Sequence, residues 1–159
     1  MSAAKILVVE DELIVATTIA NKLSRIGYIV TAKVTSGSQA IAKAIETKPD
    51  LILMDIFLKG EIDGITAAAQ IRQQLNIPVI YLTAYADHNT LERAKLTKPL
   101  AYIIKPFNEI ELQVAIELAL YQNKLERSLI AVFGILPMGS EGFLTVVIVL
   151  ITMTHKPAG

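Results

Sequence analysis

The sequence predicts an α/β fold, a doubly wound parallel sheet of five strands with helices on both faces. Five short runs rich in apolar and β-branched residues alternate with five longer segments of helical period. One run, Leu51–Met54, is apolar throughout, which is typical of a strand buried on both faces of a parallel sheet. Strands that alternate with helices form βαβ units, whose right-handed crossovers leave only a few doubly wound strand orders.

Each element can be justified in chain order. In the first helical segment the apolar residues at 15, 19, 23 and 26 lie on one face, and Gly27 provides a natural end. Asn108 is a side chain suited to begin the last helix. Strands are expected at Lys5–Val9, Tyr28–Val34, Leu51–Met54, Pro78–Leu82 and Leu100–Ile104. Helices are expected at Glu12–Ile26, Ser36–Thr47, Asp63–Leu75, Asn89–Leu96 and from Glu109 onward.

Composition narrows the classes of function. The 159 residues are enough for one ordinary domain with some chain left over, and they include no cysteine. Disulfides, thiolate nucleophiles and cysteine-ligated metals are therefore excluded, and a reducing cytoplasm is expected. With 15 basic and 15 acidic residues, the chain has no overall field that would recruit nucleic acid. The N-terminal segment turns acidic after a short apolar run, so we do not expect a signal peptide.

The charges are unevenly distributed, which predicts two units. Residues 1–127 hold 14 basic and 14 acidic residues, whereas residues 128–159 hold only Glu141 and Lys156. We expect a soluble domain over 1–127 and an apolar C-terminal extension over 128–159 without a recognisable output domain. Pro137 and the glycines after it interrupt the apolar stretch, so a membrane span is not expected. A hairpin, an exposed aggregation-prone segment and a truncated or altered reading frame all stay open for the extension.

Polar residues follow four of the five predicted strands. Glu10 and Asp11 follow the first strand, Asp55 the third, Thr83 the fourth and Lys105 the fifth. Because the carboxyl ends of parallel strands meet at one edge of the sheet, these residues should lie together despite their distance in sequence. A carboxylate there can act as a nucleophile toward a phosphoryl group. Mg²⁺ bound to the other carboxylates and the Lys105 ammonium would neutralise the incoming charge.

Five motifs carry a resemblance to a known family. They are ILVVEDE at the first strand end, PDLILMDI around Asp55, the pair Asp63-Gly64, PVIYLTAY around Thr83, and AYIIKPF around Lys105. Residues 3–127 thereby resemble the receiver domain of two-component response regulators. The resemblance implies a flavodoxin-like three-layer sandwich with strand order 2-1-3-4-5. It also implies a protein that catalyses only its own phosphorylation and dephosphorylation.

The resemblance assigns chemical roles. It implies that Asp55 is the phosphoacceptor, and that Mg²⁺ or Mn²⁺ is bound by Glu10, Asp11, Asp55 and the backbone carbonyl of Phe57. Lys105 and Ala84 would contact the phosphoryl group.

The resemblance also implies a switch and partners. Thr83 and Tyr102 would form the switch pair, and Pro106 the turn after the site. The donor would be a histidine kinase or a histidine phosphotransfer domain. The response would pass through the face made by the fourth helix, fifth strand and fifth helix, in a free-standing protein or in part of a larger hybrid kinase or regulator.

Bulky residues beside Asp55 suggest a long-lived phosphoryl group. Phe57 lies two residues past Asp55 and Tyr85 two past Thr83, and the loop after Asp55 is about two residues longer than the family's usual form. Our hypothesis is that these rings hinder the attacking water. Phe57 also argues against a haloacid-dehalogenase-like phosphatase, which needs an acid at that position. A nucleotide- or flavin-binding module is disfavoured because no glycine-rich loop follows the first strand.

The last helix carries an apolar stripe at residues 110, 114, 118, 121, 125 and 129. We expect its first half to pack on the core. Its continuation past Leu120 predicts a connector to an output module or a contact with a partner helix. A homodimer is a separate expectation that stays open.

Overall fold

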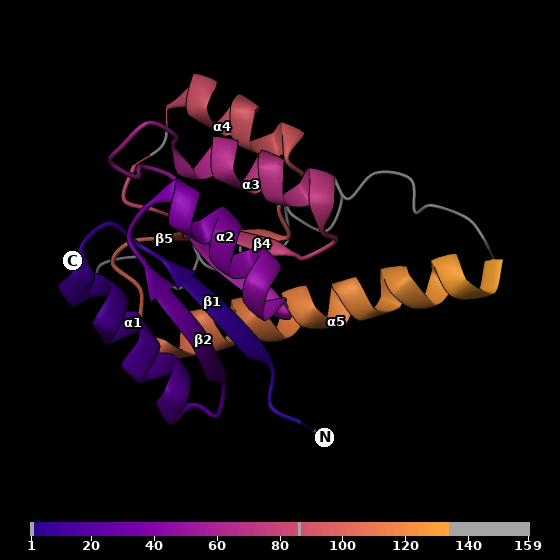
Figure 1. Cartoon of the computed structure of the whole chain (residues 1–159). Helices are drawn as coiled ribbons and strands as arrows, with labels where there is room; N and C mark the ends of the chain where they lie inside the picture. Colours follow the sequence, from indigo (N-terminus) through magenta and orange to yellow (C-terminus); the bar gives the residue numbers. More distant parts are fainter. Residues whose placement is uncertain (1, 86, 134–159) are drawn as a thin grey trace, which may run out of the picture.

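A parallel sheet of five strands organises residues 2–85 and 87–133, the part of the chain that the computed structural model describes (Figure 1). The strands are β1 (Lys5–Val9), β2 (Ile29–Val34), β3 (Leu51–Asp55), β4 (Val79–Thr83) and β5 (Ala101–Ile104). The helices are α1 (Leu13–Arg25), α2 (Gly37–Thr47), α3 (Gly64–Gln74), α4 (His88–Leu96) and α5 (Glu109–Phe133). Strands and helices alternate along the chain, as the sequence predicts.

The strand order is β2-β1-β3-β4-β5, and every pair is parallel. This confirms the predicted flavodoxin-like α/β class. The register of the β1–β3 pair also determines which residues meet at the edge of the sheet. Val9 is paired with Met54, so the next residue on each strand, Glu10 and Asp55, comes level at the carboxyl edge of the sheet.

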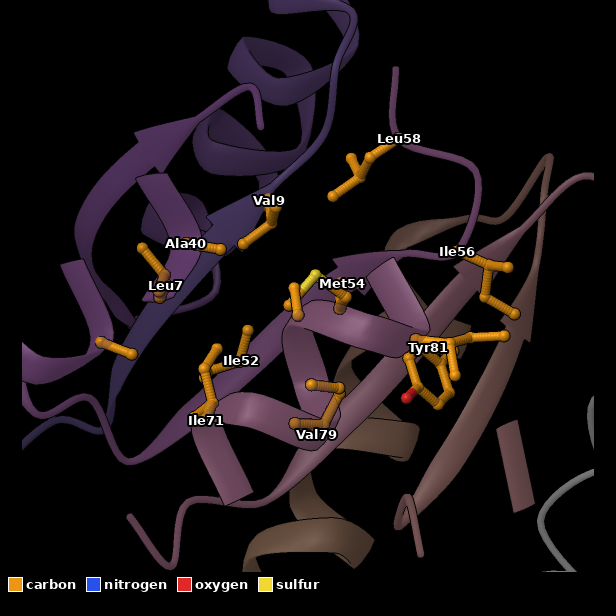
Figure 2. Packing of buried hydrophobic residues seen from close by; sticks show 14 of the residues in the cluster. Leu7, Val9, Ala40, Ile52, Met54, Ile56, Leu58, Ile71, Val79 and Tyr81 are labelled. Atoms are coloured by element: carbon orange, nitrogen blue, oxygen red, sulfur yellow. The ribbon is translucent and has the colours of Figure 1, made fainter. Parts of the chain in front are cut away.

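Two apolar layers cover the faces of the sheet. Successive side chains of a strand point to opposite faces, so alternate residues of β1 and β3 enter different layers. One layer packs under α1 and α5. The other packs under α2, α3 and α4, and the side chains of Leu7, Val9, Ile52 and Met54 project into it (Figure 2). Both faces of the central strands are therefore buried, which explains their almost wholly apolar sequences.

Side-chain caps fix where four helices begin. Ser36, Asp63 and Asp87 each accept a hydrogen bond from the backbone N–H three residues later. Asn108 accepts one from Glu111 N at 2.8 Å, and the Glu111 carboxylate accepts one from Asn108 N at 3.1 Å. These bonds satisfy N–H groups that have no partner within a helix, and the last pair forms a capping box at the start of α5.

The expected packing of α5 is wrong in one respect. The first half of the apolar stripe does not pack on the core, because Ile110 is 72% exposed, Val114 42% and Leu118 40%. A second apolar face of the same helix packs on the sheet instead, formed by Leu112, Ala115, Ile116 and Ala119. The helix therefore has two apolar faces, and a four-residue spacing alone could not tell which of them faces inward.

Helix α5 continues beyond the expected domain boundary at residue 127 and ends at Phe133 within the described residues. Among the described helices, none combines the length and the apolar character needed to cross a membrane. The remaining alternatives for the C-terminal extension concern residues 134–159, which lie outside the described residues.

Candidate functional site

Three carboxylates meet at the carboxyl edge of the sheet. Glu10 follows β1 and Asp55 ends β3, and these strands are neighbours. One carboxylate oxygen from each of Glu10, Asp11 and Asp55 lies within 4.8 Å of the other two. Glu10 and Asp55 are buried and Asp11 is half-buried. The fold thus brings together the three acids that the strand ends suggested.

Lys105 joins two of these carboxylates from the other end of the sheet. It follows β5, and its backbone N–H donates to the Thr83 carbonyl at 2.8 Å, which continues the β4–β5 pairing. Its Nζ donates to Glu10 Oε2 and lies 3.2 Å from Asp55 Oδ2. Lys105 therefore pairs with two of the three carboxylates and the exposed Lys59 with the third, so the fully ionised cluster carries more negative than positive charge.

The pKa values of this cluster reflect burial and mutual charge. The pKa of Glu10 is raised to about 7, chiefly by burial and also by the negative charge of Asp55, against the opposing hydrogen bond from Lys105. Burial on its own would lower the pKa of Lys105, but its hydrogen bond to Glu10 and the charges of both acids raise it. Lys105 is thus held in its charged form by the acids around it, whereas Glu10 is costly to ionise.

The backbone holds Asp55 in place. Asp55 Oδ1 accepts a hydrogen bond from Phe57 N at 3.0 Å, while Oδ2 faces Lys105. Gly64 begins α3 directly against this turn, and its N–H donates to the Ile56 carbonyl at 2.9 Å. A Cβ on Gly64 would lie 1.9 Å from the Asp55 carbonyl oxygen, so only glycine fits there. The glycine of the Asp63-Gly64 pair therefore allows α3 to approach the acid.

Thr83 ends β4, the strand next to the one that carries Asp55, and Tyr102 lies within β5. Thr83 is buried, and its hydroxyl donates to the Tyr85 carbonyl at 2.6 Å. Tyr102 is 8% exposed, and its ring lies 5.8 Å from that of Tyr81. Its hydroxyl is buried and has no hydrogen-bond partner among the described residues. Thr83 thus bonds to its own loop, and Tyr102 is packed beneath α4.

The other predicted site residues are exposed to solvent. Phe57 is 48% exposed and Tyr85 72%, while Ala84 and Pro106 are also exposed. The bond between Lys105 and Pro106 is cis. Sequence reasoning missed Lys59, whose Nζ lies 3.9 Å from Asp11 Oδ2. The available signal in the sequence was its place in the loop that follows Asp55 at the end of β3.

The donor set suits a hard divalent cation. Three carboxylates offer oxygen ligands only, which is the chemistry that Mg²⁺ and Mn²⁺ prefer. The described part of the site provides no soft sulfur or imidazole ligand at this cluster. Glu10, Asp11 and Asp55 could therefore hold Mg²⁺, which would also offset the excess of negative charge.

Comparison with known proteins identifies the family. Residues 6–117 match the family model described as the response regulator receiver domain. The chain belongs to this family. Receiver domains are typically phosphoacceptors rather than enzymes acting on other substrates, and they use Mg²⁺.

Two curated relatives illustrate the similarity of this receiver domain. It is 36% identical over 115 residues to the transcriptional regulatory protein PdtaR of Mycobacterium tuberculosis, covering 72% of this chain and 56% of that protein. It is 40% identical over 114 residues to the response regulator protein VraR of Staphylococcus saprophyticus, covering 70% and 54%. The chain thus spans about half the length of these curated relatives.

Solved structures of receiver domains are similar in fold to this chain. The signal receiver domain of a modulated diguanylate cyclase from Desulfovibrio desulfuricans superposes with a TM-score of 0.75 at 35% identity, covering 78% of this chain and 98% of that one. The BeF3-activated N-terminal receiver domain of RstA from Klebsiella pneumoniae gives 0.67 at 31% identity, covering 73% and 97%.

Proposed function

We propose that this receiver domain takes a phosphoryl group onto Asp55 in an Mg²⁺-dependent reaction and works in the cytoplasm. The donor would be a histidine kinase or a histidine phosphotransfer domain, in keeping with the family. One observation carries the proposal. Three carboxylates lie within 4.8 Å of one another at the sheet edge, and the Lys105 ammonium lies 3.2 Å from Asp55 Oδ2.

The chemistry follows from the residues present. A carboxylate oxygen of Asp55 would attack the phosphorus of a phosphohistidine, forming a P–O bond while the P–N bond breaks. The imidazole leaves with the bonding electron pair, and a proton returns to it. Lys105 offers positive charge to the transferred group, and the Phe57 N–H orients Asp55. When bound by Glu10, Asp11, Asp55 and the Phe57 carbonyl, Mg²⁺ would supply the charge that lets a phosphoryl dianion approach.

We propose that the response starts at Thr83. Its hydroxyl would exchange the Tyr85 carbonyl for a phosphoryl oxygen, with Ala84 N–H as a neighbouring donor. Tyr102 is already packed inward with an unpaired hydroxyl, so a rearranged β4–α4 loop could supply its partner. Such a change would shift the populations of two packed states and alter the face formed by α4, β5 and α5.

The partner of this face depends on the protein context. The chain spans about half the length of these curated relatives. We therefore propose that residues 1–127 form a receiver unit that works with an output module or partner protein. The role of residues 128–159 as an extension stays a proposal, and α5 carries the first six of them without a break. PdtaR is named a transcriptional regulatory protein, which supports an output in gene control for relatives of this kind.

Phosphorylation by acetyl phosphate tests the proposal. The wild-type chain in Mg²⁺ should gain the mass of one phosphoryl group, and Asp55→Asn should gain none. Glu61→Gln is a matched control, because this exposed carboxylate lies in the same loop outside the cluster. It should be labelled like the wild type. Labelling of Asp55→Asn, or labelling unaffected by EDTA, would contradict the proposal.

A further inference from the structure

The loop between β3 and α3 is anchored at two points. The side chain of Leu58 is buried with Val9 and Ala40 in the apolar layer under α2 (Figure 2). Ile62 packs against the same layer. It lies so close to the start of α2 that a Cβ added to Gly37 would meet its Cγ1 at 2.6 Å. The stretch between Leu58 and Ile62 is therefore held in place at both ends.

Lys59 extends from this anchored loop to the carboxylate cluster. Gly60, directly after it, has a φ of 118°, a turn conformation that favours glycine. The Lys59 Nζ lies 3.9 Å from Asp11 Oδ2. Because Asp11 follows β1, the lysine reaches from the end of β3 to the end of the neighbouring strand. Among the described residues, Lys59 is the cation that pairs with Asp11.

The ion pair between Lys59 and Asp11 contributes little to folding. The Lys59 side chain is 87% exposed, and an ion pair with so exposed a partner is weak because water and salt screen it. Lys105 differs, since its side chain is 22% exposed and pairs with the buried acids Glu10 and Asp55. Lys105 is therefore fixed within the cluster, whereas Lys59 can swing into solvent at little cost.

The charge of Lys59 has its main effect on a cation at the cluster. The Asp11 side chain is 10% exposed, so its carboxylate is less accessible to solvent than the lysine that pairs with it. A divalent cation held by Asp11 would come close to the Lys59 ammonium, and the two positive charges would repel each other. Binding of the cation therefore requires that Lys59 leave Asp11.

We infer that Lys59 competes with Mg²⁺ for Asp11 and thereby lowers the affinity of the carboxylate cluster for the metal. The inference rests on the Mg²⁺ site of the proposed function. It adds that a residue outside the set of metal ligands determines the Mg²⁺ concentration at which Asp55 can be phosphorylated. Lys59 acts on the metal through its charge and needs no contact with the transferred group.

Calorimetric titration of the full chain with Mg²⁺ tests the inference without a phosphodonor. At low salt, Lys59→Gln should bind Mg²⁺ roughly threefold to tenfold more tightly than the wild type. Lys59→Arg keeps the positive charge and should bind like the wild type. Lys95→Gln is the matched control, because it makes the same change in net charge in the last turn of α4, far from the carboxyl edge where this helix begins. It should leave the affinity unchanged.

Ionic strength separates competition between charges from a change in the structure of the loop. The ratio of the Mg²⁺ affinities of Lys59→Gln and the wild type should fall toward one in about 1 M salt, where the screening length is about 3 Å. A ratio that stays the same at all salt concentrations would indicate a rearranged loop and would overturn the inference. An unchanged affinity in Lys59→Gln, or an equal increase in Lys95→Gln, would also overturn it.

Labelling with acetyl phosphate separates this inference from the proposed function. At saturating Mg²⁺ the labelling rate of Lys59→Gln should equal that of the wild type, and the half-saturating Mg²⁺ concentration should fall by the same factor as the dissociation constant. Slower labelling at saturating Mg²⁺ would make Lys59 a contact of the donor and would overturn the inference. A wild type that binds Mg²⁺ but takes up no phosphoryl group would contradict the proposed function alone, and the calorimetric comparison would still decide the inference.

Discussion

At the scale of single residues, the geometry of Asp55 depends on a neighbour that carries no chemistry. Phe57 N holds Oδ1 and Lys105 faces Oδ2, so both oxygens of the acid have a defined direction. The turn that permits this passes directly against Gly64, whose missing side chain leaves room for the Asp55 carbonyl. The position of the Asp55 carboxylate is therefore tied to the packing of α3.

Replacing Gly64 by alanine should strongly destabilise the fold. The new Cβ would lie 1.9 Å from the Asp55 carbonyl oxygen, so the backbone has to move. We expect a loss of about 3 kcal/mol or more in the free energy of unfolding, measured by urea denaturation. Gly60→Ala is the control: its φ is 118° but nothing lies within 4 Å, so backbone strain alone should cost about 1–2 kcal/mol. Equal losses for both variants would contradict this explanation.

Replacing Phe57 by asparagine should shorten the lifetime of the phosphoryl group several-fold. The ring is half-exposed at the rim of the site, two residues past Asp55, where it can exclude water from an in-line approach. The measurement is the decay of labelled protein after the removal of acetyl phosphate. Leu96→Asn, which changes an equally apolar but distant and exposed side chain, should leave the decay unchanged. An unchanged rate of phosphoryl loss in Phe57→Asn would contradict the hypothesis that this ring hinders the attacking water.

Much of the site could be predicted, because strand ends are visible in the sequence. Glu10, Asp11, Asp55, Thr83 and Lys105 all lie at the expected edge of the sheet. The direction of a side chain could not be predicted. That Lys105 reaches back to Glu10, and that the Thr83 hydroxyl turns to its own loop, depends on rotamers and burial that only the folded chain defines.

At the scale of elements, the boundaries of the expected strands and helices agree with the structure to within one residue at most ends. Caps explain this accuracy, since Asp63 and Asn108 mark the starts of α3 and α5 by local chemistry. The packing of α5 was the exception. Its two apolar faces share the same period, so only the tertiary contacts of Leu112 and Ile116 decide which one is buried.

Removing the cap of α5 should cost about 1 kcal/mol. In Asn108→Ala the Glu111 N–H loses its acceptor, and one half of the capping box is lost. Gln113→Ala, at an exposed position of the same helix, should change stability by less than about 0.5 kcal/mol. Urea denaturation of both variants checks the difference. A loss no larger than that of the control would show that the cap is not required.

At the scale of the whole molecule, the ionisation of Glu10 in the carboxylate cluster makes both folding stability and metal binding depend on pH. The pKa of Glu10 is about 7 in the folded protein and 4.5 as an ordinary value. A group whose pKa is raised on folding stabilises the fold at low pH, and this stabilisation is lost as the pH rises through the folded value. Without metal, part of the stabilisation from protonated Glu10 is therefore still present at pH 6, and nearly all of it is lost at pH 8.

Magnesium should oppose this pH dependence of stability. A cation that binds only the folded state stabilises it by mass action, and it binds ionised carboxylates. We expect Mg²⁺ to raise the melting temperature more at pH 8 than at pH 6, because at pH 6 most Glu10 must lose a proton before it can act as a ligand. Asp55→Asn should lose most of this increase at both pH values, since a cluster ligand is gone. Glu10→Gln should make the effect of Mg²⁺ similar at the two pH values, because the titrating group is absent. If Glu10→Gln keeps the wild-type pH dependence, another group controls it, and the charge balance described for Glu10, Asp55 and Lys105 is wrong.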